Sequence, residues 1–305
     1  NSTELKMAIA KKFKLDIKNI LVGAGSDELI EIIGRLFFTK QDEIVISKHA
    51  FIRYQMAVRL MDAKSVIVPM KEGLYHDLKA MAKACTKDTK AVFIANPNNP
   101  TGTYNTTKEF EDFMKSLPTN RYGLKPVVIL DEAYHEFASY KKDYPDTLKF
   151  LNKYPNMIIL RTFSKIYALA GARVGYGFSS DSIVDYIERI RLPFNLNMFA
   201  QVGAAASLQD KAQVTKSLAH VRKEMKFICD GFKKLGIKYV DSVGNFILFS
   251  VAPFAGKDVF KKMLCEGVII RAMDEYDLPE WLRVTIGTRK ENELFLRKIK
   301  KVLGK

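Results

Sequence analysis

Residues 162–177 read TFSKIYALAGARVGYG, and this stretch decides how the rest of the chain is interpreted. The apolar run MIIL immediately before it predicts a buried strand. That strand leads into a turn that carries Thr162, Ser164 and Lys165, and the glycines after the turn allow close approach to neighbouring backbone. Because ligands of open α/β sheets bind at the carboxyl ends of the strands, we expect Lys165 to face a pocket.

The amine of Lys165 is predicted to be reactive. Arg173 lies eight residues further on and would place a fixed cation near the same pocket. A desolvated lysine beside a cation has a lowered pKa, which makes it a nucleophile able to form a Schiff base. Taken alone, the segment also fits a surface lysine and an arginine in an ordinary ion pair, so the other segments have to decide.

The composition excludes several classes of protein. Hydrophobic residues make up 48% of the 305 residues and charged residues 27%, which indicates a globular protein with no need of disulfides. The net charge of +15 is spread along amphipathic segments such as FLRKIKKVLGK rather than collected in one block, so we expect no nucleic-acid partner. No stretch approaches the roughly 18 apolar residues of a membrane span, so we expect no membrane role.

The cysteines and histidines indicate neither disulfides nor a metal site. Cys85, Cys229 and Cys265 are odd in number and far apart, which is typical of reduced thiols in a cytoplasmic protein. The four histidines are scattered, and no cysteine pair has the spacing of metal ligands. We therefore expect no zinc.

A second glycine turn lies near the start of the chain, in residues 19–37 (NILVGAGSDELIEIIGRLF). Its Gly-x-Gly spacing resembles a dinucleotide fingerprint, but Glu28 stands where the third glycine would be, which argues against NAD. Gly25 would let backbone approach a ligand, and Ser26 and Asp27 would begin a helix whose free N–H groups favour a phosphate. An ordinary helix N-terminus fits this stretch equally well.

Three further predicted strands are followed by aromatic or polar residues. Phe51 comes after EIVIS, where its ring could cover a flat ligand, although Phe51 and Tyr54 could equally be core residues. Asn99 lies in a proline-rich turn that cannot be helical. Asp131 ends the apolar strand PVVIL, with Tyr134 three residues beyond. A carboxylate there needs a cation or N–H partner: a protein partner would make it structural, and a pyridinium would make it catalytic.

One ligand fits all five strand ends, namely a planar, phosphorylated heteroaromatic aldehyde. Asp131 would keep the ring nitrogen protonated, and Asn99 and Tyr134 would hold the ring hydroxyl. The lysine would form the Schiff base and then shuttle a proton. Ser164 and Arg173 would join the helix N-terminus on the phosphate.

These residues resemble the signature of the fold-type I aminotransferases that use pyridoxal phosphate, which in this chain is Asn99-Pro100-Thr101-Gly102, Asp131-x-x-Tyr134, Ser164-Lys165 and Arg173. The resemblance covers nearly the whole chain. Within that superfamily the strings STELK, VGAGSDEL, NPNNPTG, DEAYHEF, TFSKIYALAGARVGY, PFNLN and LRVTIGTRKENE are most similar to the histidinol-phosphate aminotransferases of histidine biosynthesis.

The resemblance implies specific roles. Lys165, Asp131 and Tyr134 would be catalytic. The residues that would bind pyridoxal 5'-phosphate are Ser26, Asp27, Phe51, Asn99, Asp131, Tyr134, Thr162, Ser164, Lys165 and Arg173. Phe51 stands at the stacking position, where many relatives have tyrosine.

The resemblance also implies a substrate. Arg283, in WLRVTIG, matches the arginine that grips the carboxylate of glutamate, and the phosphate of histidinol phosphate must occupy the same place. Arg271 is expected to assist, because two arginines suit a dianion, although a surface ion pair is the alternative. The expected reaction moves an amino group between L-histidinol phosphate and 2-oxoglutarate or glutamate in a homodimer. The sequence starts after the N-terminal segment that in the family covers the substrate and sends a tyrosine to the partner's cofactor.

The expected fold class is α/β, with a large domain at 1–200 whose mostly parallel sheet lies between helices, and a smaller α+β domain at 201–305. The alternatives within this fold are an aromatic amino acid aminotransferase and a threonine-phosphate decarboxylase. A pyridoxal-phosphate-binding regulator would normally carry a DNA-binding module, and the 305 residues show none. A Ser/Lys hydrolase would need serine where Thr162 stands.

Overall fold

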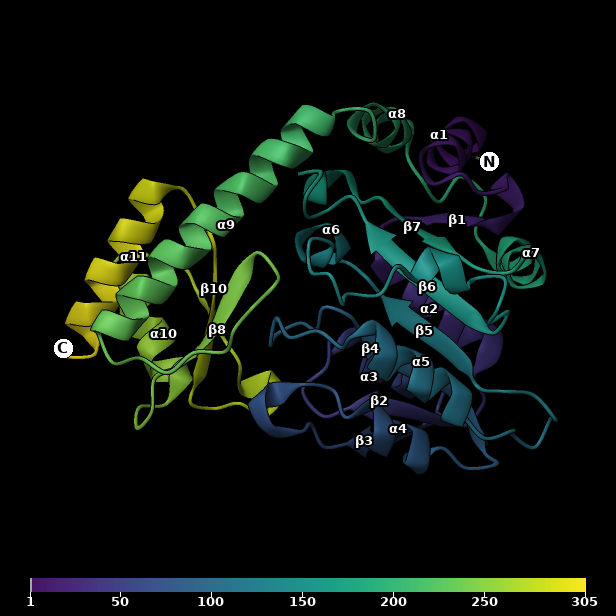
Figure 1. The fold of residues 1–305 in the computed structure, drawn as a ribbon, viewed down its shortest axis with the longest axis horizontal. Helices are drawn as coiled ribbons and strands as arrows, with labels where there is room; N and C mark the ends of the chain where they lie inside the picture. The colour runs from purple at the N-terminus through teal and green to yellow at the C-terminus, as the bar shows by residue number, and fades with distance from the viewer. Residues whose placement is uncertain (1) are drawn as a thin grey trace.

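The computed structural model describes residues 2–305, which form two sheets of unequal size with helices packed around them (Figure 1). The predicted α/β fold with a mostly parallel large sheet is confirmed. The strands are β1 (Ile20–Gly23), β2 (Glu43–Ser47), β3 (Lys64–Val68), β4 (Thr89–Ala95), β5 (Val127–Asp131), β6 (Met157–Thr162), β7 (Gly175–Phe178), β8 (Phe246–Ser250), β9 (Arg271–Ala272) and β10 (Trp281–Thr285). The α-helices are α1 (Thr3–Phe13), α2 (Ser26–Phe37), α3 (Arg53–Leu60), α4 (Leu78–Ala84), α5 (Thr107–Ser116), α6 (His135–Ala138), α7 (Asp181–Ile190), α8 (Met198–Ser207), α9 (Lys211–Lys234), α10 (Gly256–Cys265) and α11 (Arg289–Val302).

The large sheet has seven strands in the order β1-β7-β6-β5-β4-β2-β3. The pairs from β3 to β6 are parallel, whereas β7 runs antiparallel to both β6 and β1. The central strands are apolar at nearly every position because helices cover both faces of the sheet. Parallel pairing brings the carboxyl ends of β2, β4, β5 and β6 to one edge of the sheet.

The two faces of the large sheet carry separate hydrophobic clusters. Val92 and Ile94 pack in the cluster that includes α1, α4, α5 and α8, whereas Ala91 and Phe93 pack in the cluster that includes α2, α3 and α7. This alternation is the period of two that a strand imposes. Within residues 2–305, none of the helices combines the length and the apolar character that crossing a lipid bilayer requires.

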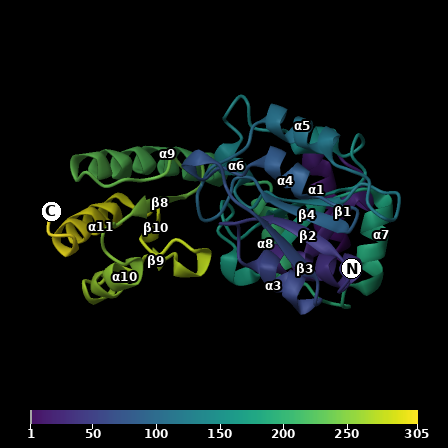
Figure 2. The ribbon, with the colours of Figure 1, turned by 90° about the horizontal axis from the view of Figure 1, so that it is seen from below.

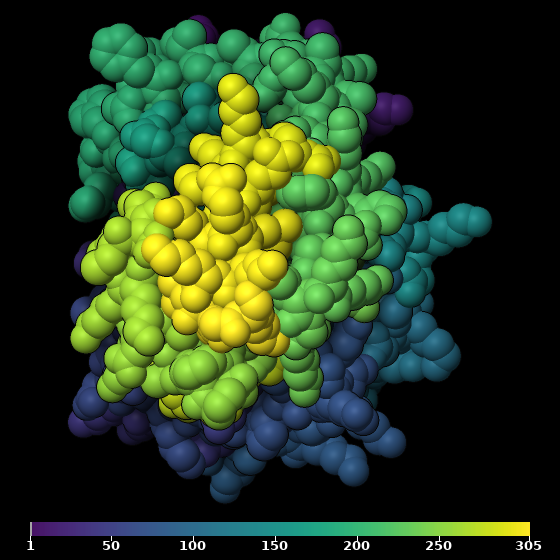
Figure 3. Space-filling view, turned by 90° about the vertical axis from the view of Figure 1, so that its left-hand side faces the viewer, coloured from purple at the N-terminus to yellow at the C-terminus, as the bar shows by residue number. Residues whose placement is uncertain are grey.

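The smaller sheet has three antiparallel strands in the order β8-β10-β9. Figure 2 shows it beside the large sheet, with α9, α10 and α11 around it. In the space-filling view of Figure 3, α11 in yellow lies beside α9 in green, and the structure gives contacts of α11 with both α9 and α10. The cluster on this sheet includes Phe232 of α9, Phe249 of β8 and Phe295 of α11.

The packing differs from the predicted boundary near residue 200, which falls inside α8. Ala200, Ala204 and Leu208 belong to the hydrophobic cluster of the large sheet. The change occurs within α9 instead, because Leu218 packs on the large-sheet cluster and Phe232 is in the small-sheet cluster. The alanine-rich texture of α8 does not show in the sequence which sheet it covers. We propose that α9 is the junction of the two domains; residue 1 lies outside the described residues.

Candidate active site

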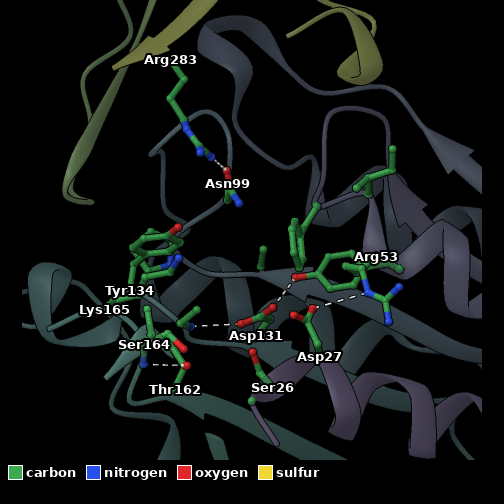
Figure 4. A pocket seen from close by; sticks show the side chains of 18 of the residues that line it. Ser26, Asp27, Arg53, Asn99, Asp131, Tyr134, Thr162, Ser164, Lys165 and Arg283 are labelled. Carbon is green, nitrogen blue, oxygen red and sulfur yellow. Dashed lines mark hydrogen bonds and ion pairs between the residues drawn. The ribbon is translucent and has the colours of Figure 1, made fainter. Parts of the chain in front are cut away.

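A cavity of about 360 Å³ opens at the carboxyl edge of the large sheet, where the smaller sheet faces it (Figure 4). Its walls come from the loops after β1, β2, β4, β5 and β6, and from β9 and β10. Every residue that the sequence predicted for the site lines this one cavity: Ser26, Asp27, Phe51, Asn99, Asp131, Tyr134, Thr162, Ser164, Lys165, Arg173, Arg271 and Arg283. Their roles stay predictions, but their predicted proximity agrees with the geometry.

One end of the cavity is formed by the N-terminus of α2. Gly25, with φ +85°, precedes the helix, and a Cβ there would lie 2.6 Å from Nη2 of Arg173. A Cβ on Gly175 of β7 would lie 2.4 Å from the backbone nitrogen of Ser26. Both glycines are therefore required by close approach. Arg173 also lies 3.5 Å from Asp27, so the helix N-terminus and a guanidinium share this end of the cavity.

The carboxylate of Asp131 lies at the floor of the cavity and is 5% exposed. Oδ2 accepts a 2.7 Å hydrogen bond from the hydroxyl of Tyr54, and Oδ1 accepts a 3.0 Å bond from the N–H of Ala133. Burial raises the pKa of this carboxyl, and the two hydrogen bonds oppose that rise. No lysine, arginine or histidine in residues 2–305 forms an ion pair with it. A cation that enters the cavity would therefore find an uncompensated anion.

Lys165 follows β6, and its side chain is accessible through the open cavity. The surrounding protein still desolvates the amine enough to lower its pKa, and the positive charges of Arg283 and Arg173 act in the same direction. The carboxylate of Asp131 opposes them. Nζ lies 5.4 Å from the centroid of the Tyr134 ring, and burial raises the pKa of Tyr134 to about 12. At neutral pH the tyrosine therefore keeps its proton.

The turn between β6 and Lys165 is held by its own hydroxyl groups. The backbone N–H of Ser164 donates a 3.0 Å hydrogen bond to Oγ1 of Thr162. Figure 4 shows Thr162, Ser164 and Ser26 on the same side of the cavity as Asp131. This local bond fixes the geometry of the turn and leaves the Ser164 hydroxyl free to contact a ligand.

The far side of the cavity belongs to the smaller sheet. Arg283 of β10 lies directly opposite Arg271 of β9 in the strand register. A guanidinium nitrogen of Arg283 donates to the side-chain oxygen of Asn99, which links the two sheets. Arg271 lines the cavity and also pairs with Glu275, so both readings of Arg271 that the sequence left open are seen in the structure.

Sequence reasoning missed three residues of the cavity wall. Tyr54 bonds to Asp131, Arg53 lies 3.5 Å from Asp27, and Tyr276 lines the wall near the arginines. Tyr54 was named only as a residue that could be in the core. The one signal was its spacing of three from Phe51, which places both rings on one helical turn.

The cavity fits pyridoxal phosphate in its donor set. Asp131 is a buried carboxylate without a cationic partner, which suits a pyridinium nitrogen. The N-terminus of α2 with Arg173 suits a phosphate, and Oδ1 of Asp27 there is buried without a hydrogen-bond partner within the described residues. The accessible amine of Lys165 suits an aldehyde.

Comparison with known proteins agrees with this fit. The sequence profile of the family "Aminotransferase class I and II" matches residues 1–299. A histidinol-phosphate aminotransferase of Anaeromyxobacter sp. (strain Fw109-5) is 42% identical over 98% of this chain and 81% of its own length. One from Akkermansia muciniphila is also 42% identical, over 98% of this chain and 80% of its own. The crystal structure of histidinol-phosphate aminotransferase from Sinorhizobium meliloti in complex with pyridoxal-5'-phosphate superimposes with a TM-score of 0.92 at 26% identity, covering 99% of this chain and 81% of that one.

Proposed function

This chain belongs to the aminotransferase class I and II family, and from that premise we propose that it transfers the amino group of L-histidinol phosphate to 2-oxoglutarate. The single observation that carries the proposal is the pairing of Arg271 with Arg283 across β9 and β10, beside the amine of Lys165. Two guanidinium groups suit a dianionic phosphate, and one of them suits the carboxylate of the second substrate. The similarity to histidinol-phosphate aminotransferases supports the same choice.

The cofactor of the proposed reaction is pyridoxal 5'-phosphate. When bound, it supplies an aldehyde that links covalently to amines and a ring that accepts the electron pair released at the substrate carbon. The residues proposed to hold its phosphate are Ser26, Asp27, Thr162, Ser164 and Arg173; those proposed to hold its ring are Phe51, Asn99, Asp131 and Tyr134; and Lys165 is proposed to hold its aldehyde carbon.

The side chains of this protein supply the acid–base chemistry. The lowered pKa of Lys165 provides a neutral amine near neutral pH, which takes the proton from the amino-bearing carbon of the substrate and returns it later. Asp131, bonded to the Tyr54 hydroxyl, holds a proton on the ring nitrogen. Tyr134, with its pKa raised to about 12, stays protonated and donates a hydrogen bond from its hydroxyl. Each role uses the protonation state that the surroundings favour.

The test of the proposed function is a comparison of three substrates with the loaded enzyme. L-Histidinol phosphate, L-phenylalanine and L-threonine phosphate are each supplied with 2-oxoglutarate, and released glutamate and carbon dioxide are both measured. We expect glutamate from L-histidinol phosphate at a kcat/KM far above that for L-phenylalanine, and no carbon dioxide. A preference for L-phenylalanine would contradict the substrate assignment, and carbon dioxide from L-threonine phosphate would contradict the reaction type.

We further propose that the enzyme is a homodimer that works in the cytoplasm. A group of apolar side chains in α8 and the loop before it is exposed, with Phe194 and Phe199 at 94% and 91%. Such a patch marks a protein–protein interface. The three cysteines are free thiols, as in a reducing compartment. Phe194→Ser with Phe199→Ser should give monomers in analytical ultracentrifugation, whereas Phe254→Ser, at an exposed phenylalanine elsewhere, should not; a monomeric wild type would refute the dimer.

A further inference from the structure

A buried ion pair lies directly behind the cavity, on the opposite face of the large sheet. Glu132 follows Asp131 at the end of β5, and Arg161 precedes Thr162 at the end of β6. The two charged residues are 0% and 2% exposed. Because successive side chains of a strand point to opposite faces, Asp131 and Thr162 face the cavity while Glu132 and Arg161 face away from it.

Several elements hold this ion pair in place. Nε and Nη2 of Arg161 lie 2.9 Å and 2.8 Å from Oε2 of Glu132. The other carboxylate oxygen, Oε1, accepts a 2.7 Å hydrogen bond from the hydroxyl of Thr147. The guanidinium carbon lies 5.3 Å from the ring centroid of Phe13 and 5.6 Å from that of Phe178. The planar guanidinium group therefore has little freedom to move.

Stability alone does not explain such a pair, because the cost of removing both charges from water can exceed their mutual attraction. The pair does join the two strand ends, since the backbone N–H of Glu132 also donates a 2.8 Å hydrogen bond to the carbonyl of Leu160. We propose that Glu132 and Arg161 are positioning residues, which fix the separation of Asp131 from Lys165 and so align the two groups in the cavity. This inference rests on the roles proposed above for Asp131 and Lys165.

The test is a double variant, Glu132→Leu with Arg161→Met, of the full chain loaded with pyridoxal phosphate. Removing both charges avoids leaving one of them buried and unpaired. We expect kcat to fall about 10- to 100-fold with KM within about twofold, because a small misplacement of a reacting group costs up to about 100-fold in rate. We also expect a shift of the pH at which the visible absorption of the bound cofactor changes, because that midpoint reports the electrostatic contact of the lysine-linked cofactor with Asp131.

A second variant covers failure of the first to fold. Arg161→Lys keeps the positive charge but loses the paired nitrogen contact with Glu132, and it should lower kcat in the same direction by a smaller factor. Thermal unfolding of each variant shows whether the protein is folded at the temperature of the assay. An unchanged kcat and an unchanged absorption midpoint in a folded variant would overturn the proposal.

The smaller sheet offers a matched control. Glu224 of α9 has a side chain that is 3% exposed, and Nη2 of Arg289 lies 2.9 Å from its Oε1. The double variant Glu224→Leu with Arg289→Met should leave kcat and the absorption midpoint unchanged. Equal behaviour of the two double variants would overturn the positioning role while the wild type still transaminates. A wild type without the visible absorption would instead overturn the proposed function, and this inference with it.

Discussion

Replacing Tyr54 by phenylalanine removes the hydroxyl that donates to Asp131 Oδ2 at 2.7 Å, and it leaves the ring stacked 4.6 Å from that of Phe93. A hydrogen bond to a charged group contributes about 1.5–3 kcal/mol. The carboxylate would keep only the 3.0 Å bond from the Ala133 N–H, so its pKa, already raised by burial, would rise further. If the full loss is expressed in the transition state, kcat falls about 10- to 150-fold.

The assay is the rate of glutamate release from L-histidinol phosphate and 2-oxoglutarate, measured from pH 5 to 9, an interval of about four units around neutrality. Because the pKa of Asp131 is expected to rise in Tyr54→Phe, its ionised form disappears at a higher pH as acid is added. The acid limb of the kcat profile should therefore move to higher pH. A circular dichroism melt and a cofactor titration establish that the variant is folded and loaded.

Tyr104 provides the matched control for this prediction. Its hydroxyl also donates to a carboxylate, that of Asp143 at 2.9 Å, but neither residue lines the cavity. Tyr104→Phe should leave kcat and the acid limb unchanged. A folded, loaded Tyr54→Phe enzyme with kcat within about twofold of wild type and the same acid limb would refute the reasoning that this hydroxyl keeps Asp131 ionised.

Three further perturbations test other parts of the site. Lys165→Ala should abolish transamination, and Asp131→Ala should lower kcat by several orders of magnitude with weakened cofactor binding, both measured by glutamate release; activity in the first would contradict the nucleophile assignment, and a near-normal rate in the second would make that carboxylate structural. Arg283→Met removes a cation that lowers the pKa of Lys165, so that pKa should rise and the pH midpoint for trapping the lysine with pyridoxal phosphate and borohydride should move up; an unchanged midpoint would mean that desolvation alone sets it. Gly175→Ala would place a Cβ 2.4 Å from the backbone nitrogen of Ser26, so the α2 N-terminus must shift and the Kd for pyridoxal phosphate should rise about tenfold or more by fluorescence titration; an unchanged Kd would mean that the phosphate lies elsewhere.

Much of the site could be predicted from the sequence because its residues follow buried parallel strands. A run such as PVVIL identifies the strand, and the residue after it must lie at the carboxyl edge whatever the order of the strands. Asp131 and Lys165 were found in this way. The glycine turn before Ser26 was found because a helix that starts there exposes its N–H groups.

The remaining features depend on tertiary contacts that no local pattern records. Tyr54 is aromatic at a helical spacing, which fits a core position as well as a bond to Asp131. The contact between Asn99 and Arg283 joins residues from different sheets, so it depends on how the two sheets are placed. The boundary predicted near residue 200 was early because α8 is rich in alanine, which indicates burial without indicating the neighbour.

The continuity of α9 limits how this protein can be divided in the laboratory. The helix has 24 residues and so spans about 36 Å, with its first half packed on the large sheet and its second half on the small one. An expression fragment cut at residue 200 would remove Ala204 and Leu208 from one core, and a cut within α9 would remove Phe232 from that of the other if it followed this residue. Neither half should be obtained as a stable separate product, and a successful split-protein design would have to keep α9 whole and duplicate it in both fragments.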